Sequence, residues 1–151
     1  MTSINLKNSF GSDLSVSVLL TDGIISVKSF IDQVESVVSG AVVSFSGNVR
    51  DHDHGKEVLG LTYEIHPTTA EALERVVREV SANHNVSSVA VSHRYGTIPI
   101  GESALIIAVA AAHREEAFRA CANLVDEIKA QIPIWKHQVF TDGTDEWVNS
   151  A

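Results

Sequence analysis

The chain has 151 residues, of which 44% are hydrophobic and 20% are charged, a composition typical of a globular protein large enough to bury a real core. Eleven basic against 19 acidic side chains give a formal net charge of −8. This balance argues against general nucleic-acid binding, which needs a basic surface against phosphates, so any anion site must be a local concentration of Lys, Arg and His.

The first 50 residues contain two strand patterns and one helix pattern. Leu14 to Leu20 alternates between apolar and polar residues, which predicts a half-buried strand. Apolar residues recur at helical spacing from Val27 to Val38, and Ser39-Gly40 supplies a stop signal for this helix. Ala41 to Val49 then predicts a strand with every second residue on one face.

The middle of the chain begins with the polar segment Arg50–Lys56, which we expect to be a loop. Leu59 to Ile65 alternates and predicts another strand. Thr68 and Glu71 have the spacing of a capping box, in which both side chains satisfy amides of the first helical turn. The helix that follows should bury the apolar stripe between Leu73 and Val80.

The last third contains two more strand patterns before a long helix. Val89 to Tyr95 alternates, whereas Ala104 to Ala110 is apolar throughout, as expected of a strand covered on both faces. A helix should run from His113 or Arg114 to Ile132. Its predicted inward residues are Phe118, Cys121, Val125, Ile128 and Ile132.

A short strand from Ile134 to Phe140 and an edge strand at Trp147-Val148 complete the order. This succession predicts an α+β fold with a mostly antiparallel sheet and helices packed on one side. The chain shows no linker or low-complexity segment, so we expect one domain over residues 1–151.

Cys121 is the single cysteine, which excludes an internal disulfide and a cysteine-based zinc cluster. We interpret it as a buried packing residue rather than a reactive thiol. The longest apolar run, Ala104–Ala112, is too short to span a bilayer, and no signal peptide pattern opens the chain. We therefore expect a reducing, cytoplasmic location.

The segment from Lys129 to Lys136 carries the strongest chemical signal. The helix should stop before Pro133, and the chain then turns back, so Lys136 can approach Lys129. Two ammonium groups about 6 Å apart repel by roughly 3 kcal/mol at an effective dielectric constant near 20. Such a pair either binds an anion or keeps one lysine neutral enough for proton transfer. The alternative is two solvated surface lysines.

Three other polar groups are candidates. Arg50 stands at the end of a predicted strand, which is a rigid platform for a side chain that meets a ligand. His113-Arg114 opens the long helix, where backbone amides already favour an anion. The run Asp51-His52-Asp53-His54 could bind a metal, but no further ligand stands at a recognisable spacing, and a flexible lid over an anion site is an alternative. His93 is interpreted as a packed or hydrogen-bonded residue of its strand.

Ordered blocks of the sequence resemble the large, catalytic subunit family of molybdopterin synthase, from about residue 40 to residue 148. The matching blocks are Gly40–Arg50, His93-Arg94-Tyr95-Gly96 with Gly101-Glu102, Ala112-His113-Arg114, and Lys129 through Pro133-Ile134-Trp135-Lys136. The resemblance implies an α/β-hammerhead-like fold, which is compatible with the α+β prediction.

The resemblance also implies an activity. Members of this family convert cyclic pyranopterin monophosphate to molybdopterin by installing two sulfurs as a dithiolene. The sulfur arrives as a thiocarboxylate on the C-terminal glycine of a small ubiquitin-like subunit. The large subunit is typically a homodimer that binds one small subunit at each end, which gives a heterotetramer. No metal and no other cofactor is implied for sulfur insertion.

Carried over by position, Lys129 resembles the essential catalytic lysine and Lys136 the second active-site lysine. The resemblance further implies that substrate is bound by Asn48, Val49, Arg50, His113, Arg114, His137 and Gln138, with His113 and Arg114 contributed, as one arrangement, by the neighbouring protomer. Two other hypotheses stay open: a non-catalytic module that binds a phosphorylated ligand or a ubiquitin-like tail, and a metal-dependent hydrolase built on Asp51 to His54.

Overall fold

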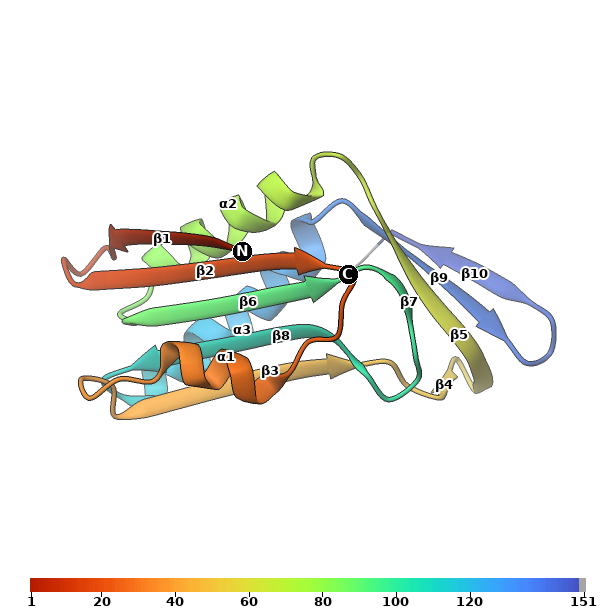
Figure 1. Cartoon of the computed structure of the whole chain (residues 1–151), viewed down its shortest axis with the longest axis horizontal. Coiled ribbons are helices and arrows are strands. Elements are labelled where there is room, and N and C mark those ends of the chain that lie inside the picture. The colour runs from red at the N-terminus through yellow and green to blue at the C-terminus, as the bar shows by residue number, and fades with distance from the viewer. Residues whose placement is uncertain (150–151) are drawn as a thin grey trace.

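The computed structural model describes residues 1–149, which form two β-sheets and three helices (Figure 1). The sheet whose strands are longer on average, called the larger sheet below, has the spatial order β1 (Thr2–Lys7), β2 (Asp13–Thr21), β6 (Ser88–Arg94), β8 (Ser103–Ala111) and β3 (Ala41–Asn48). In it, β2 and β6 run parallel and the other neighbouring strands are antiparallel.

The second sheet lies at the right-hand end of Figure 1, and every pair of its strands is antiparallel. Its strands are β10 (Asp145–Val148), β9 (Ile134–Phe140), β5 (Lys56–Ile65) and β4 (His52–Asp53), with β7 (Gly96–Ile98) also paired to β5. The predicted α+β class with mostly antiparallel strands is confirmed. The edge strand expected at Trp147-Val148 is β10.

The helices cover both faces of the larger sheet. Helices α2 (Thr69–Ala82) and α3 (Arg114–Gln131) bury their apolar stripes together on one face, as expected. Helix α1 (Val27–Val34) packs on the opposite face through Phe30, so the prediction that the helices pack on one side of the sheet is wrong for α1. Strand β8 has an apolar side chain at nearly every position and therefore needs cover on both faces, which is the arrangement its continuous run predicted.

Helix α1 ends four residues earlier than its apolar spacing predicts. Glu35 already has extended backbone angles, and the side chain of Val38 is 72% exposed. Helix propensity is low at Val37, Val38 and the serines beside them. A further helical turn would have no neighbouring surface to pack against, since both valines are exposed. The helix stops where its contact with the sheet stops.

Two details of the other helices differ from the prediction. Phe118 was expected to point inward but is 61% exposed, because the small residues Ala117 and Ala120 bring α3 close to the sheet. The capping box also does not form: the Thr68 hydroxyl contacts the ring of His66 rather than an amide.

None of the helices in residues 1–149 is long and apolar enough to cross a lipid bilayer.

Candidate functional site

A cavity of about 270 Å³ lies where the larger sheet meets the second sheet. Strands β3, β6 and β8 of the larger sheet contribute one wall, strands β4, β5 and β9 the other, and the end of α3 closes it. Its polar lining residues are Asn48, Arg50, His52, Asp53, Tyr63, His93, Lys129, Lys136 and Gln138. Six of the nine site residues that the sequence predicted line this cavity: Asn48, Val49, Arg50, Lys129, Lys136 and Gln138.

Lys129 and Lys136 reach the same cavity because α3 ends between them. Helix α3 stops at Gln131, Ile132 has extended backbone angles, and Pro133 leads directly into β9. Burial lowers the pKa of Lys129, and the positive charge of Lys136 lowers it further. The site therefore holds a lysine that gives up its proton more readily than a solvated one.

The end of β3 is held rigidly beside the lysines. The Val49 amide donates to the Glu102 carbonyl at 3.0 Å, and the Gly101 amide donates to the Val49 carbonyl at 2.7 Å. The Glu102 carboxylate in turn pairs with the guanidinium of Arg94 at 2.8 Å, and the Arg94 side chain is buried. These contacts fix the backbone from which Arg50 enters the cavity.

Hydrogen bonds hold the side-chain amide of Asn48 in one orientation. Its Oδ1 accepts hydrogen bonds from the hydroxyls of Ser46 at 2.6 Å and Ser103 at 3.1 Å. Because Oδ1 is satisfied in this way, the NH₂ group is the part of the amide that is available to the cavity. Asn48 therefore adds a neutral donor to the cationic lining.

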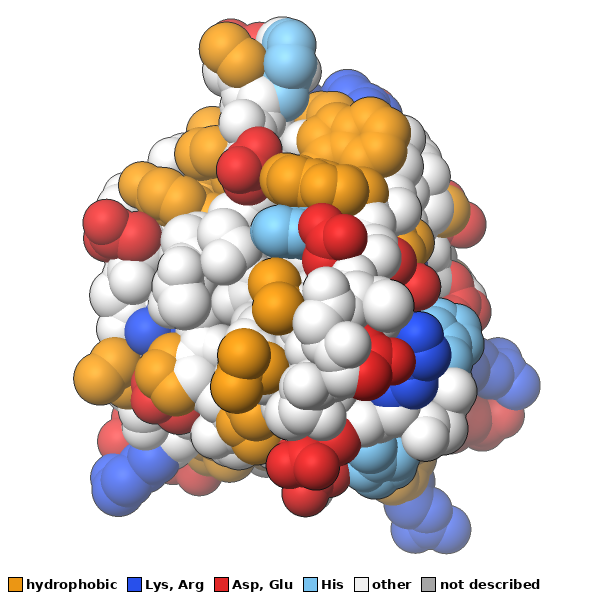
Figure 2. All heavy atoms as spheres, turned by 90° about the vertical axis from the view of Figure 1, so that its right-hand side faces the viewer, with side chains coloured by type: hydrophobic (Ala, Val, Ile, Leu, Met, Phe, Trp, Pro, Cys, Tyr) orange, Lys and Arg blue, Asp and Glu red, His pale blue; other side chains and the backbone are white. Residues whose placement is uncertain are grey.

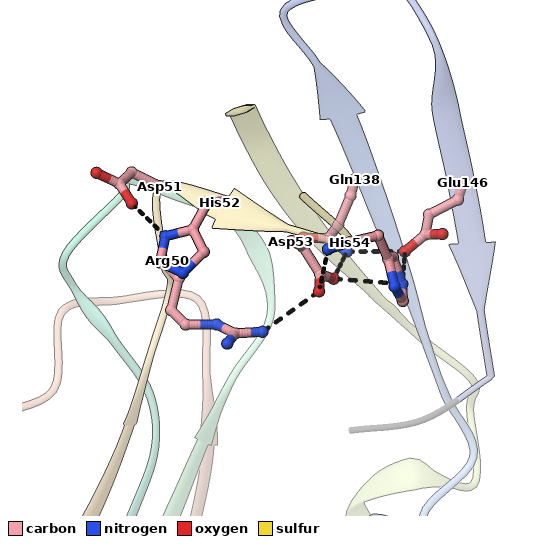
Figure 3. Close-up of polar contacts among 7 residues, drawn as sticks. All are labelled: Arg50, Asp51, His52, Asp53, His54, Gln138 and Glu146. Atoms are coloured by element: carbon pink, nitrogen blue, oxygen red, sulfur yellow. Dashed lines mark hydrogen bonds and ion pairs between the residues drawn. The ribbon is translucent and has the colours of Figure 1, made fainter. Parts of the chain in front are cut away.

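Asp53 is the one acidic residue of the lining, a position that was considered from the sequence only as part of a metal site or a lid. Gln138 donates to its Oδ2 at 2.6 Å, and Arg50 lies 3.3 Å from its Oδ1 (Figure 3). The hydrogen bond from Gln138 lowers the pKa of Asp53, and the charges of neighbouring cations add to the effect. With three cations against this single carboxylate, the cavity is positive in a chain of net charge −8.

The polar run after Arg50 separates into two groups, as Figure 3 shows. His52 turns to Asp51, with 2.7 Å between Nδ1 and Oδ1. The ligand atoms of Asp53, His54 and Glu146 lie within 4.8 Å of one another, close enough in principle for a metal. However, the Gln138 amide already donates to both carboxylates of this trio, which makes it a hydrogen-bond network within the protein. The four-residue metal site considered from the sequence is therefore not assembled, because Asp51 and His52 point elsewhere.

His113 and Arg114 lie at the opposite end of α3 from the cavity. At 1.5 Å per residue, the helix separates Arg114 from Lys129 by about 22 Å. Both side chains are exposed, and Glu115 and Glu116 supply the negative charge that suits the first turn. The structure thus does not bring this basic pair to the cavity of its own chain.

His137 also lies away from the cavity. Successive residues of a strand point to opposite faces, so Lys136 and Gln138 face the cavity and His137 faces outward. Its ring stacks on Trp147 with 4.2 Å between centroids, and its Nε2 lies 2.8 Å from Asp145. These contacts join β9 to β10.

Comparison with known proteins finds a matching family. The family model described as "MoaE protein" matches residues 20–131. A relative from Oryza sativa subsp. indica, named molybdopterin synthase catalytic subunit, is 38% identical over 80% of this chain and 63% of its own length. A relative of the same name from Thermoplasma volcanium is 33% identical over 89% of this chain and 98% of its own length.

A solved structure shares the fold. The crystal structure of molybdopterin synthase from Staphylococcus aureus superposes with a TM-score of 0.76 at 28% identity, over 87% of this chain and 95% of that chain. The chain spans less than two thirds of the length of the plant relatives that it matches.

Proposed function

The chain belongs to the MoaE family, and we propose on this basis that it is the catalytic subunit of a molybdopterin synthase. It transfers sulfur from the thiocarboxylated C-terminus of a small ubiquitin-like subunit to cyclic pyranopterin monophosphate, and the product is the dithiolene of molybdopterin. The enzyme is thus a sulfurtransferase. The observation that carries the proposal is the shared cavity of Lys129 and Lys136.

The charge of the cavity suits both reactants. The substrate is an anionic cyclic phosphate, and the sulfur donor is an anionic tail. Arg50, Lys129 and Lys136 concentrate positive charge in one hollow of an acidic protein, and Asn48 adds a donor. Anions are therefore attracted to the cavity rather than to the surface as a whole.

Each lysine has a proposed task. Lys129, with its lowered pKa, contacts the thiocarboxylate and moves a proton as sulfur adds to the pterin. Lys136 holds the substrate phosphate or stabilises the negative charge that develops during addition. Val49 and Gln138 shape the wall, Val49 through its backbone bonds and Gln138 by holding Asp53. No resident metal or other cofactor has a task in this scheme.

The assembly is proposed to be a homodimer within a heterotetramer. The second sheet exposes large hydrophobic side chains, among them Leu59, Trp135 and Trp147, and Figure 2 shows hydrophobic side chains gathered on this end of the molecule. Exposed groups of this kind commonly mark protein–protein contacts. His113 and Arg114 could serve a site only across such an interface, because their own cavity is a helix length away. His137, packed on Trp147, would shape the outer surface rather than bind substrate.

Residues 1–151 are proposed to act as one domain, and the reaction is proposed to take place in a reducing cytoplasm, which suits a buried free thiol. Burial raises the pKa of Cys121 to about 11, so this thiol is protonated and unreactive at neutral pH.

Reconstitution tests the proposal. The purified chain is mixed with a thiocarboxylated small subunit and cyclic pyranopterin monophosphate, and molybdopterin is quantified. We expect the wild type to form product, Lys129→Ala to lose turnover by several orders of magnitude, and Cys121→Ser to retain it. A wild-type chain that binds both reactants but forms no product would instead identify a non-catalytic binding module. Equal turnover in wild type and Lys129→Ala would refute the assignment of Lys129.

A further inference from the structure

His93 is a buried titratable residue at the floor of the cavity to which the proposed chemistry assigns no task. It lies near the end of β6, its side chain is 1% exposed, and it lines the same cavity as Lys129. A histidine buried only for packing needs no contact with a cavity. This one is placed where its ring meets the catalytic centre.

The hydrogen bond at Nδ1 of His93 defines which ring nitrogen carries the proton. Its Nδ1 lies 2.9 Å from the carbonyl oxygen of Arg94. A carbonyl oxygen can only accept, so Nδ1 is the donor and Nε2 carries a lone pair in the neutral ring. The ring stays neutral at working pH, because burial lowers the pKa of His93 to about 4 and the nearby charge of Lys129 acts in the same direction.

The ring is also held in place. Tyr63 meets it edge-on, with 5.2 Å between ring centroids and an interplanar angle of 90°. Tyr63 pairs with Lys136 in the register of β5 and β9, and Tyr63, His93 and the two lysines line the same cavity. The other charged groups of the cavity are Lys136, Arg50 and Asp53. Of all these, Lys129 is the one whose charge bears on the titration of His93.

We propose that His93 is a positioning residue, whose unprotonated Nε2 accepts a hydrogen bond from Nζ of Lys129 and fixes the direction of this amine in the cavity. The proposal deepens the proposed function and rests on it for the importance of Lys129. An imidazole suits the task because it offers an acceptor without a negative charge. A carboxylate at the same place would pair with Lys129, keep it protonated and repel the anionic reactants.

Kinetics of two His93 variants test the proposal. His93→Leu removes the acceptor and His93→Gln keeps one. We expect His93→Leu to lower kcat at least about tenfold with KM changed by less than about twofold, because orientation rather than binding is lost. His93→Gln should recover part of the loss. His84→Leu is the matched control, since His84 is a histidine outside the cavity, and it should leave kcat unchanged.

A second measurement needs no activity. NMR titration of the His93 imidazole in the Lys129→Met variant should show its pKa above the wild-type value, because the charge of Lys129 that lowers it is gone. An unchanged titration, or a His93→Leu enzyme that folds and turns over like the wild type, would overturn the proposal. If the wild-type chain is inactive in reconstitution while this coupling is observed, then the proposed function fails and the His93–Lys129 contact stands.

Discussion

The side-chain amine of Lys129 lies where burial and a second positive charge act on it together. Burial is the larger cause of its lowered pKa, and the charge of Lys136 is the second. A lower pKa makes the amine of Lys129 easier to deprotonate than a solvated lysine, which favours proton transfer. The two contributions can be separated, because Lys136 can be replaced without uncovering Lys129.

Removal of the charge at position 136 should raise the pKa of Lys129 toward its ordinary value. Lys136→Met keeps the aliphatic stem, so burial is preserved while the repulsion is lost. The pH at which Lys129 becomes reactive in competitive acylation, followed by peptide mass spectrometry, should therefore move upward. Lys56→Met is the control, since Lys56 pairs with Asp142 outside the cavity. An identical acylation profile in wild type and Lys136→Met would show that the two charges do not interact.

Replacement of Asn48 by Asp should weaken anion binding specifically. The carboxylate can still accept from Ser46 and Ser103, so the local fold survives, but a negative oxygen replaces the NH₂ group that the cavity receives. We expect at least about tenfold weaker binding of cyclic pyranopterin monophosphate, measured by calorimetry, which corresponds to about 1.4 kcal/mol or more. Asn123→Asp makes the same charge change at an exposed site of α3. Equal losses in the two variants would point to overall charge rather than to Asn48.

The lysine pair could be predicted from the sequence because Pro133 imposes a local rule on the backbone. His93 and Asp53 could not be identified as lining residues in the same way. The alternation of β6 places His93 on an inner face, and only the packing of the second sheet against the first determines that this face opens into a cavity. Asp53 sits in a run of charged residues whose directions depend on contacts with β9 and β10, far away in the chain.

At the scale of elements, strands were predictable where alternation continued unbroken, as in β2 and β6. Strand β5 departs from the pattern because its register shifts between Val58 and Gly60. This irregularity buries Val58 and exposes Leu59, although the alternation of Leu59 with Leu61 predicts a shared face. The shift arises where β5 pairs with β9, which is distant in the chain. The alternation of residues within β5 alone therefore cannot predict it.

Gly40 shows how closely two elements approach at the start of β3. A Cβ atom at this position would lie 2.6 Å from the carbonyl oxygen of Ala112, which is backbone and cannot swing aside. We expect Gly40→Ala to lower the free energy of unfolding by about 1–3 kcal/mol in urea denaturation. Gly60→Ala is the matched control, because a Cβ there meets nothing within 4 Å. A Gly40→Ala protein as stable as wild type would mean that the backbone at Ala112 can shift away from the added Cβ without lowering the free energy of unfolding.

At the scale of the whole molecule, the cavity that Lys129 lines and the basic pair His113-Arg114 lie at opposite ends of α3. One chain can therefore offer a lysine-lined cavity and, about 22 Å away, a second cationic surface. If both groups act on the same anionic substrate, two chains must face each other so that the basic pair of one reaches the cavity of the other. The proposed homodimer is then a requirement of the site and not only a mode of assembly.

Mixing of two inactive variants distinguishes this arrangement from a site contained in one chain. Lys129→Ala and the double variant His113→Ala/Arg114→Ala are co-expressed with different tags, and the mixed dimers are purified. In a shared site, one cavity of each mixed dimer receives an intact lysine from one chain and an intact basic pair from the other. We therefore expect mixed dimers to regain about half of the wild-type turnover per dimer.

The control pairs Lys129→Ala with Lys136→Ala. Both lysines line the cavity of their own chain, so every cavity of this mixed dimer lacks one of them and no activity should return. Recovery in the first mixture and none in the second would locate the two lysines in one protomer and the basic pair in its partner. Absence of recovery in both mixtures, from dimers that bind the small subunit normally, would show that His113 and Arg114 do not complete a neighbouring site.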